Sequence, residues 1–159
     1  MVGNVRAILI ALGLLGMSAC APGEVLLGEP PQGYVEDAKA RVAAAEWSQA
    51  ETVTVALSEF RFRPQELDFR KGAPYRLRIE NRGKLSHTFD AEGFFAAIAV
   101  QKVRSGGSET ALPYVKRLVV ASEEATDLYF VAVTPGTYDL ECSVPLHDTF
   151  GMTGRIVIR

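Results

Sequence analysis

The chain has 159 residues, of which 48% are apolar and 23% are charged, with 17 Lys and Arg against 19 Asp and Glu. This length suits one globular domain, and the composition fits neither a multi-span membrane protein nor a disordered chain. A formal net charge of −2 without a basic cluster argues against nucleic acid as a partner. Two His, two Cys and three Met exclude most enzymes that use several metals or several histidines.

The first residues are typical of an export signal. Arg6 precedes an apolar run over residues 7–19, which is too short for a membrane-spanning helix and suits the apolar region of a signal peptide. We therefore predict a signal peptide over residues 1–19. The small residues before Cys20 resemble a bacterial lipoprotein signal, in which cleavage precedes a Cys that carries lipid.

Two alternatives to a lipoprotein stay open. An ordinary signal cleaved after Ala21 would leave Pro22 as the first mature residue, and an uncleaved anchor would need a longer apolar run. The lipoprotein interpretation places the protein on the periplasmic side of a bacterial membrane, anchored through lipid on Cys20. Ala21 rather than Asp after this Cys favours the outer over the inner membrane in a Gram-negative cell.

Residues 20–50 are predicted to form the lipid-anchor tether and a short helix. Pro and Gly are frequent over residues 21–34, as in a tether. A helix is expected over residues 35–47, because four apolar residues share one face there: Val35, Ala38, Val42 and Ala45.

Residues 51–159 are predicted to form one all-β domain. Apolar residues alternate with polar ones at residues 53–57 and 75–79, and four further strand candidates lie at residues 118–120, 128–133, 138–142 and 155–158. Short strands separated by Pro and Gly turns indicate an antiparallel sandwich or barrel. Residues 92–104 instead predict a helix, with Phe94, Phe95 and Ile98 on its buried face, followed by a loop at residues 105–108.

Four scarce side chains carry the chemistry. Cys142, His147 and Met152 are spaced C-x4-H-x4-M on a predicted loop, and His87 follows an earlier strand. If Cys20 carries lipid, Cys142 is an unpaired thiol in an oxidising compartment, and a metal is the usual group that holds such a thiol. A thiolate, two imidazoles and a weak thioether are the donors of a blue copper centre, whereas structural zinc favours a fourth strong donor. Singly, each residue also fits a structural role; together they predict one copper ion.

The residues around this motif resemble those of a known family. The segments at residues 136–142 and 151–158 are similar to the closing segment of cupredoxins, the small blue copper proteins, and the C-x4-H-x4-M spacing is most like that of auracyanin and rusticyanin. Residues 60–64 and 81–89 are similar to the first half of the family. The resemblance implies a Greek-key antiparallel β-sandwich.

The resemblance also implies roles for single residues. His87, Cys142 and His147 would be the equatorial ligands of copper and Met152 the axial one, while Thr88 would tie the two ligand loops together. Relatives often have Gly where this chain has Leu146. Residues 91–125 match no part of a minimal cupredoxin, and their predicted helix would cover either the copper site or the edge of the sandwich.

The resemblance implies a one-electron carrier rather than an enzyme. A copper ion with four protein ligands has no open position for substrate, and two His are too few for the further coppers of an oxidase. An apolar patch beside His147 would bind a redox protein such as a cytochrome, and it would be formed by Pro145, Leu146 and Phe150. The protein is expected to be a monomer. The alternatives are copper carriage or sequestration, a thiol enzyme using Cys142, and an interaction module without metal.

Overall fold

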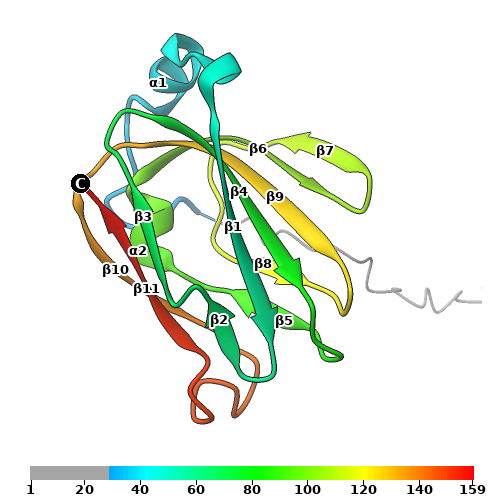
Figure 1. The fold of residues 1–159 in the computed structure, drawn as a ribbon. Coiled ribbons are helices and arrows are strands. Elements are labelled where there is room, and N and C mark those ends of the chain that lie inside the picture. Colours follow the sequence, from blue (N-terminus) through cyan, green and yellow to red (C-terminus); the bar gives the residue numbers. More distant parts are fainter. Residues whose placement is uncertain (1–28) are drawn as a thin grey trace, which may run out of the picture.

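The structure is a computed structural model that describes residues 29–159, and it is a β-sandwich with short helices (Figure 1). The predicted signal peptide and Cys20 lie outside the described residues. The larger sheet has the order β2-β1-β4-β9-β6-β7. Its strands are β1 (Glu51–Ser58), β2 (Arg61–Arg63), β4 (Pro74–Asn81), β6 (Ile98–Ser105), β7 (Ser108–Ala111) and β9 (Ala125–Ala132).

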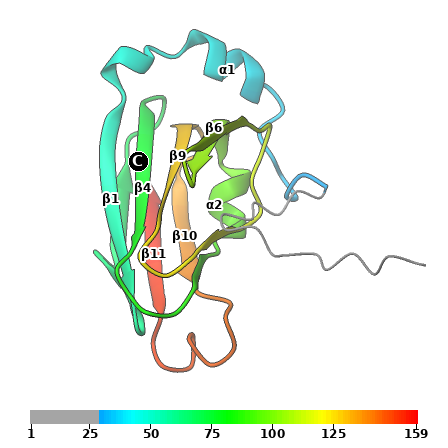
Figure 2. The same ribbon diagram turned by 90° about the vertical axis from the view of Figure 1, so that its right-hand side faces the viewer.

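The second layer combines two smaller sheets. One has the order β10-β11-β3 and the other pairs β5 with β8. Strands β10 and β11 appear to the right of β1 and β4 in Figure 2. Asp90 and Glu141 exchange two backbone hydrogen bonds, at 3.1 and 2.9 Å, and so place β5 beside β10. The strands are β3 (Glu66–Phe69), β5 (His87–Phe89), β8 (Leu118–Val120), β10 (Gly136–Glu141) and β11 (Thr153–Ile158).

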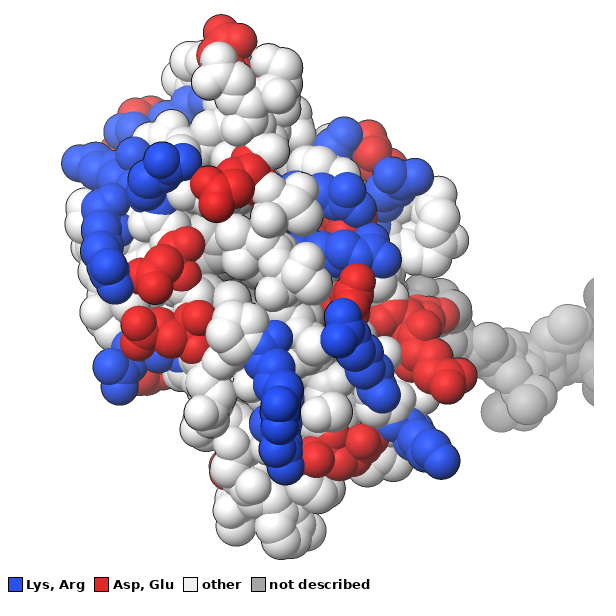
Figure 3. All heavy atoms as spheres, viewed as in Figure 1, with Lys and Arg blue, Asp and Glu red and all other residues white. Residues whose placement is uncertain are grey.

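Alternation along the strands builds the core between the layers. In β4 the side chains of Tyr75, Leu77 and Ile79 are buried, and those of Arg76 and Arg78 lie on the outer face, as the sequence predicted. Both arginines pair with Asp127 of β9. Basic and acidic side chains are interspersed over the face of the molecule drawn in Figure 3.

The β-sandwich is confirmed, but two of its strand pairs are parallel rather than antiparallel. β1 pairs in parallel with β4, and β3 pairs in parallel with β11. The chain leaves the larger sheet after β2 and places β3 in the other layer before it returns as β4. Because of this excursion, β4 runs in the same direction as β1.

The helix predicted over residues 92–104 is wrong beyond its first turn. Helix α2 covers only Glu92–Ala96, and the chain then becomes β6. The first half of β6, residues 98–100, is buried on both faces, so its apolar residues do not alternate, and a register shift between Val100 and Lys102 breaks the period again. The expected loop is a hairpin turn at Gly106 and Gly107, whose φ angles of 54° and 80° suit a tight two-residue turn into β7.

The N-terminal helix has the predicted face but is shorter. Helix α1 covers Ala38–Ala44, followed by a 3-10 turn, η1, at Trp47–Gln49. All four residues of the predicted face belong to a small apolar cluster with Val131 and Val133 on the larger sheet. Among the described residues, no helix is long and apolar enough to cross a membrane. The division of the chain at residue 51 stays a prediction.

Candidate metal centre

Adjacent strands of the second layer bring two of the predicted ligands together. His87 is the first residue of β5 and pairs with Val120 of β8. Cys142 directly follows β10, which lies beside β5 through the bridge between Asp90 and Glu141. Both side chains are fully buried, with exposed fractions of 0%. The ends of two neighbouring strands therefore present an imidazole and a thiol to the same point.

The loop over residues 143–152 folds back to bring the other two residues to this point. The backbone N–H of Cys142 donates to the carbonyl of Met152 at 3.1 Å, and the N–H of Met152 donates to the carbonyl of His147 at 3.0 Å. Gly151 has a φ of 94°, a left-handed conformation that favours glycine and lets the loop turn into β11. The Met152 side chain is fully buried, and His147 is 6% exposed.

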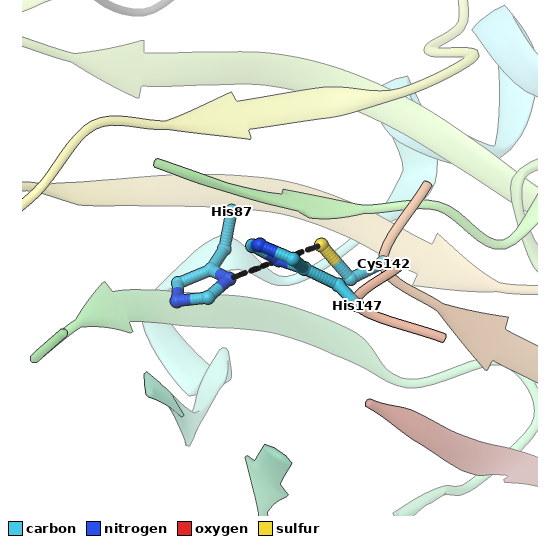
Figure 4. A group of neighbouring side chains, drawn as sticks. All are labelled: His87, Cys142 and His147. Carbon is cyan, nitrogen blue, oxygen red and sulfur yellow. Dashed lines mark hydrogen bonds between the residues drawn. The ribbon is translucent and has the colours of Figure 1, made fainter. Parts of the chain in front are cut away.

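The three donor atoms form a small triangle (Figure 4). His147 Nδ1 lies 3.1 Å from His87 Nδ1 and 3.4 Å from Cys142 Sγ, and the third side, from Sγ to His87 Nδ1, is 3.9 Å. Trigonal bonds of about 2.0 Å to nitrogen and about 2.3 Å to sulfur place two nitrogens about 3.5 Å apart and a nitrogen and a sulfur about 3.7 Å apart. The triangle matches this arrangement within about 0.4 Å.

The electrostatic setting also suits a metal. Burial, and then the charge of His147, lower the pKa of His87 below its ordinary value of 6.5, so the ring is neutral at pH 7 and offers a lone pair. With Met152 packed beside the triangle, the buried donor set fits a single type 1 copper ion.

Thr88 joins the two halves of the site, as the resemblance implied. Its backbone N–H and its Oγ1 lie 3.4 and 3.6 Å from Cys142 Sγ. Oγ1 also accepts a hydrogen bond of 2.8 Å from the backbone N–H of Ser143. The strand of His87 and the loop of Cys142 are therefore braced through one hydroxyl group that also faces the sulfur.

The side chain that covers His147 is Phe60, which the sequence did not single out. Its ring lies 4.7 Å from the His147 ring, edge to face, and 5.1 Å from the ring of Phe150. Phe94 and Phe95 of α2 lie instead in the core, where neither ring is in contact with the rings of His87 and His147 and their partners are other aromatic residues: Phe69, Phe89, Phe130 and Tyr138. Their packing does not support a helical roof over the metal site.

Solved structures with the same architecture include copper proteins. A multicopper oxidase from Campylobacter jejuni is 14% identical, with a TM-score of 0.53 over 68% of this chain and 30% of that chain. A multicopper oxidase from Pseudomonas thermotolerans is 20% identical, with a TM-score of 0.57 over 72% of this chain and 31% of that chain. Multicopper oxidases of this kind contain cupredoxin domains. This chain has the cupredoxin fold.

Other comparisons do not bear on this fold assignment. Auracyanin from Roseiflexus castenholzii is 16% identical, with a TM-score of 0.46 over 69% of this chain and 98% of that chain. No family model and no curated protein matches the sequence. The chain spans about a third of the length of the two oxidases described above.

Two further polar residues, Asn81 and Glu59, hold the loop that leads to His87. Asn81, at the end of β4, is buried and hydrogen-bonded to the loop before His87. Glu59 accepts hydrogen bonds from two backbone N–H groups of the same loop, and that of Leu85 contributes most to lowering the pKa of this carboxyl group. Asn81 opens an Asn-x-Gly sequence at residues 81–83, which is a signal for a turn, whereas no local pattern marks Glu59.

Proposed function

We propose that this protein is an exported, lipid-anchored mononuclear blue copper protein that carries single electrons. His87, Cys142 and His147 would be the equatorial ligands and Met152 the axial one, and bound copper would supply the one-electron couple. The observation that carries the proposal is the buried triangle of two imidazoles and one thiol. Each donor comes from the chain itself, so the site needs no partner to complete it.

The surroundings of the donors suit electron transfer, because little has to move when the charge on a metal changes. His87 sits in a paired strand, and Thr88 braces that strand against the loop of Cys142. The carbonyl groups of His147 and Met152 accept hydrogen bonds within the ligand loop. A held geometry of this kind limits reorganisation between oxidation states.

An apolar surface beside the site offers a place for a redox partner such as a cytochrome. Leu146 and Phe150 are each 63% exposed and flank His147 in sequence, and Leu85 of the neighbouring loop is 49% exposed. The end of the molecule that carries the ligand loop is largely free of charged side chains on the face drawn in Figure 3. Exposed apolar side chains at one end of a protein favour contact with another protein.

Electron transfer without turnover fits the donor set better than catalysis does. In the described part of the chain, one group of His, Cys, Asp and Glu side chains has metal-site geometry, and it contains both histidines of the sequence. A second copper would therefore lack imidazole ligands. Carriage of copper to another protein would require exchange of ligands that here are almost fully buried.

Leu146 allows a sharp test of the docking surface. Its φ of 71° is left-handed, a conformation that costs a side chain about 1–2 kcal/mol. Leu146→Gly relieves this strain and removes an exposed apolar side chain. We expect the variant to keep its copper spectrum and to be at least as stable as the unaltered protein, while electron transfer to a cytochrome slows about fivefold, as for loss of about 1 kcal/mol of docking energy.

Glu123→Gly is the matched control, because Glu123 is another exposed residue with a left-handed φ, of 62°. Stopped-flow kinetics would compare both variants with the unaltered protein. Equal rates in all three would contradict docking at this surface. Rapid loss of copper to a chelator in both oxidation states would favour carriage over electron transfer.

A further inference from the structure

The imidazole of His87 has one nitrogen whose partner is missing from the site described so far. Nδ1 lies beside His147 Nδ1 and Cys142 Sγ. Nε2 is buried and, among the described residues, makes no hydrogen bond. The carboxylate of Glu59 faces it, with Oε1 at 3.6 Å, slightly beyond hydrogen-bond distance.

The loop before His87 is built around this carboxylate. Glu59 Oε1 accepts hydrogen bonds from the backbone N–H groups of Lys84 at 2.6 Å and of Leu85 at 2.8 Å. A Cβ atom at Gly83 would lie 2.6 Å from the same oxygen, so only glycine leaves room for it. Glu59 is thus held in place by two backbone donors of the loop, with the imidazole of His87 near the same oxygen.

The tautomer of His87 supplies the chemical reason for this arrangement. A neutral imidazole carries one proton, and a nitrogen that donates its lone pair to a metal cannot hold it. When Nδ1 binds copper, the proton is therefore on Nε2, in a buried position where it needs an acceptor. Among the described residues, the carboxylate of Glu59 is the charged acceptor that faces this nitrogen.

We propose that Glu59 is a positioning residue that accepts the Nε2–H of His87 and thereby orients Nδ1 toward copper. The inference rests on the proposed function, because it assumes that Nδ1 is a ligand. A carboxylate that accepts the outer N–H of a ligating imidazole makes the ring a stronger donor. A stronger donor stabilises Cu(II) more than Cu(I), so Glu59 lowers the reduction potential.

Glu59→Gln separates the charge from the shape. The amide oxygen of Gln can still accept from Lys84 and Leu85, so the loop keeps its brace while the anionic acceptor is lost. We expect about a tenfold loss of Cu(II) affinity with unchanged Cu(I) affinity. This ratio corresponds to a reduction potential about 59 mV higher.

Two further variants isolate the contact. Gly83→Ala displaces the Glu59 carboxylate without changing its chemistry, and it should raise the potential in the same direction. Glu66→Gln removes an exposed carboxylate from β3 and should leave the potential unchanged. Voltammetry of the full copper-loaded chain in detergent would measure all four proteins.

Proton NMR of the Zn(II)-loaded full chain reads the hydrogen bond directly, since zinc also accepts a Cys and two His ligands and is diamagnetic. A downfield, slowly exchanging Nε2–H of His87 is expected in the unaltered protein and in Glu66→Gln. In Glu59→Gln and Gly83→Ala this signal should move upfield and exchange faster. If Glu59 only braced the loop and made no hydrogen bond to His87, these substitutions would change the stability of the protein but not the Nε2–H signal.

The result that overturns the inference is an unchanged potential and an unchanged Nε2–H signal in Glu59→Gln. The proposed function fails separately, if the unaltered protein with Cu(II) lacks an intense thiolate-to-copper band. The zinc-loaded spectra still test the contact between Glu59 and His87 in that case.

Discussion

Asn81 is the polar side chain that fixes the approach to His87, and its removal should be costly. The residue is 2% exposed at the end of β4. Its Nδ2 donates to the carbonyls of Leu85 at 2.8 Å and Val120 at 2.9 Å, and its Oδ1 accepts from the N–H of Gly83 at 2.9 Å. Val120 is the residue that pairs with His87. One amide therefore connects three segments around the site.

The structure gives the size of the effect. Asn81→Ala removes three hydrogen bonds, each of which contributes about 1 kcal/mol net, so the free energy of unfolding should fall by about 3 kcal/mol. Asn81→Asp has the same shape, but it places a carboxylate oxygen against two carbonyl groups in place of the donor. We therefore expect Asn81→Asp to be less stable than Asn81→Ala at neutral pH, although it is the more conservative change.

Chemical denaturation of the apoprotein would measure both changes. Trp47 is the single Trp of the chain and lies in the cluster between α1 and the larger sheet, so its fluorescence reports unfolding. Gln65→Ala, which removes an exposed amide, is the control and should change stability by less than about 0.5 kcal/mol. A loss below about 1 kcal/mol in Asn81→Ala, or an Asp variant as stable as the Ala variant, would refute this account of the loop.

Two further predictions concern the ligands. Met152→Leu conserves volume in the core, so it should cost less than about 1.5 kcal/mol of stability. Voltammetry of this variant should show a higher reduction potential, because a weak axial donor to Cu(II) is lost. An unchanged potential would contradict an axial role for Met152. Because the pKa of His87 is lowered in the fold from 6.5, the unfolded apoprotein binds its proton at a higher pH than the native one, and the free energy of unfolding should decrease as the pH falls below 6.5. Denaturation of a His87→Asn variant should show a weaker pH dependence, and equal slopes would contradict the shift.

The grouping of His87, Cys142 and His147 could be predicted from the sequence because His and Cys are scarce and two of these residues lie five positions apart. Backbone hydrogen bonds join Cys142 to Met152 and Met152 to His147, so the loop that carries them keeps these residues close together. His87 is far away in sequence, but the chain holds only one other His. Because so few His and Cys residues are present, the sequence alone left few possible sets of ligands.

Other features of the structure could not be predicted from the sequence, for physical reasons. The first three residues of β6 are all buried, so its apolar run has no period of two there and is easily taken for a helix. The pair Gly106 and Gly107 was the available signal for the hairpin that follows. Glu59 and Phe60 reach the site only through the packing of β1 and β2 against the ligand loops, and a carboxylate or a phenyl ring at a strand end carries no local signature of that contact.

Visible absorption of the full chain in detergent, after addition of one equivalent of Cu(II), tests the central claim most directly. The account predicts an intense thiolate-to-copper band that is absent from a Cys142→Ser variant measured beside it. Copper binding with only weak colour, or a band that survives in Cys142→Ser, would contradict a blue copper centre built on Cys142.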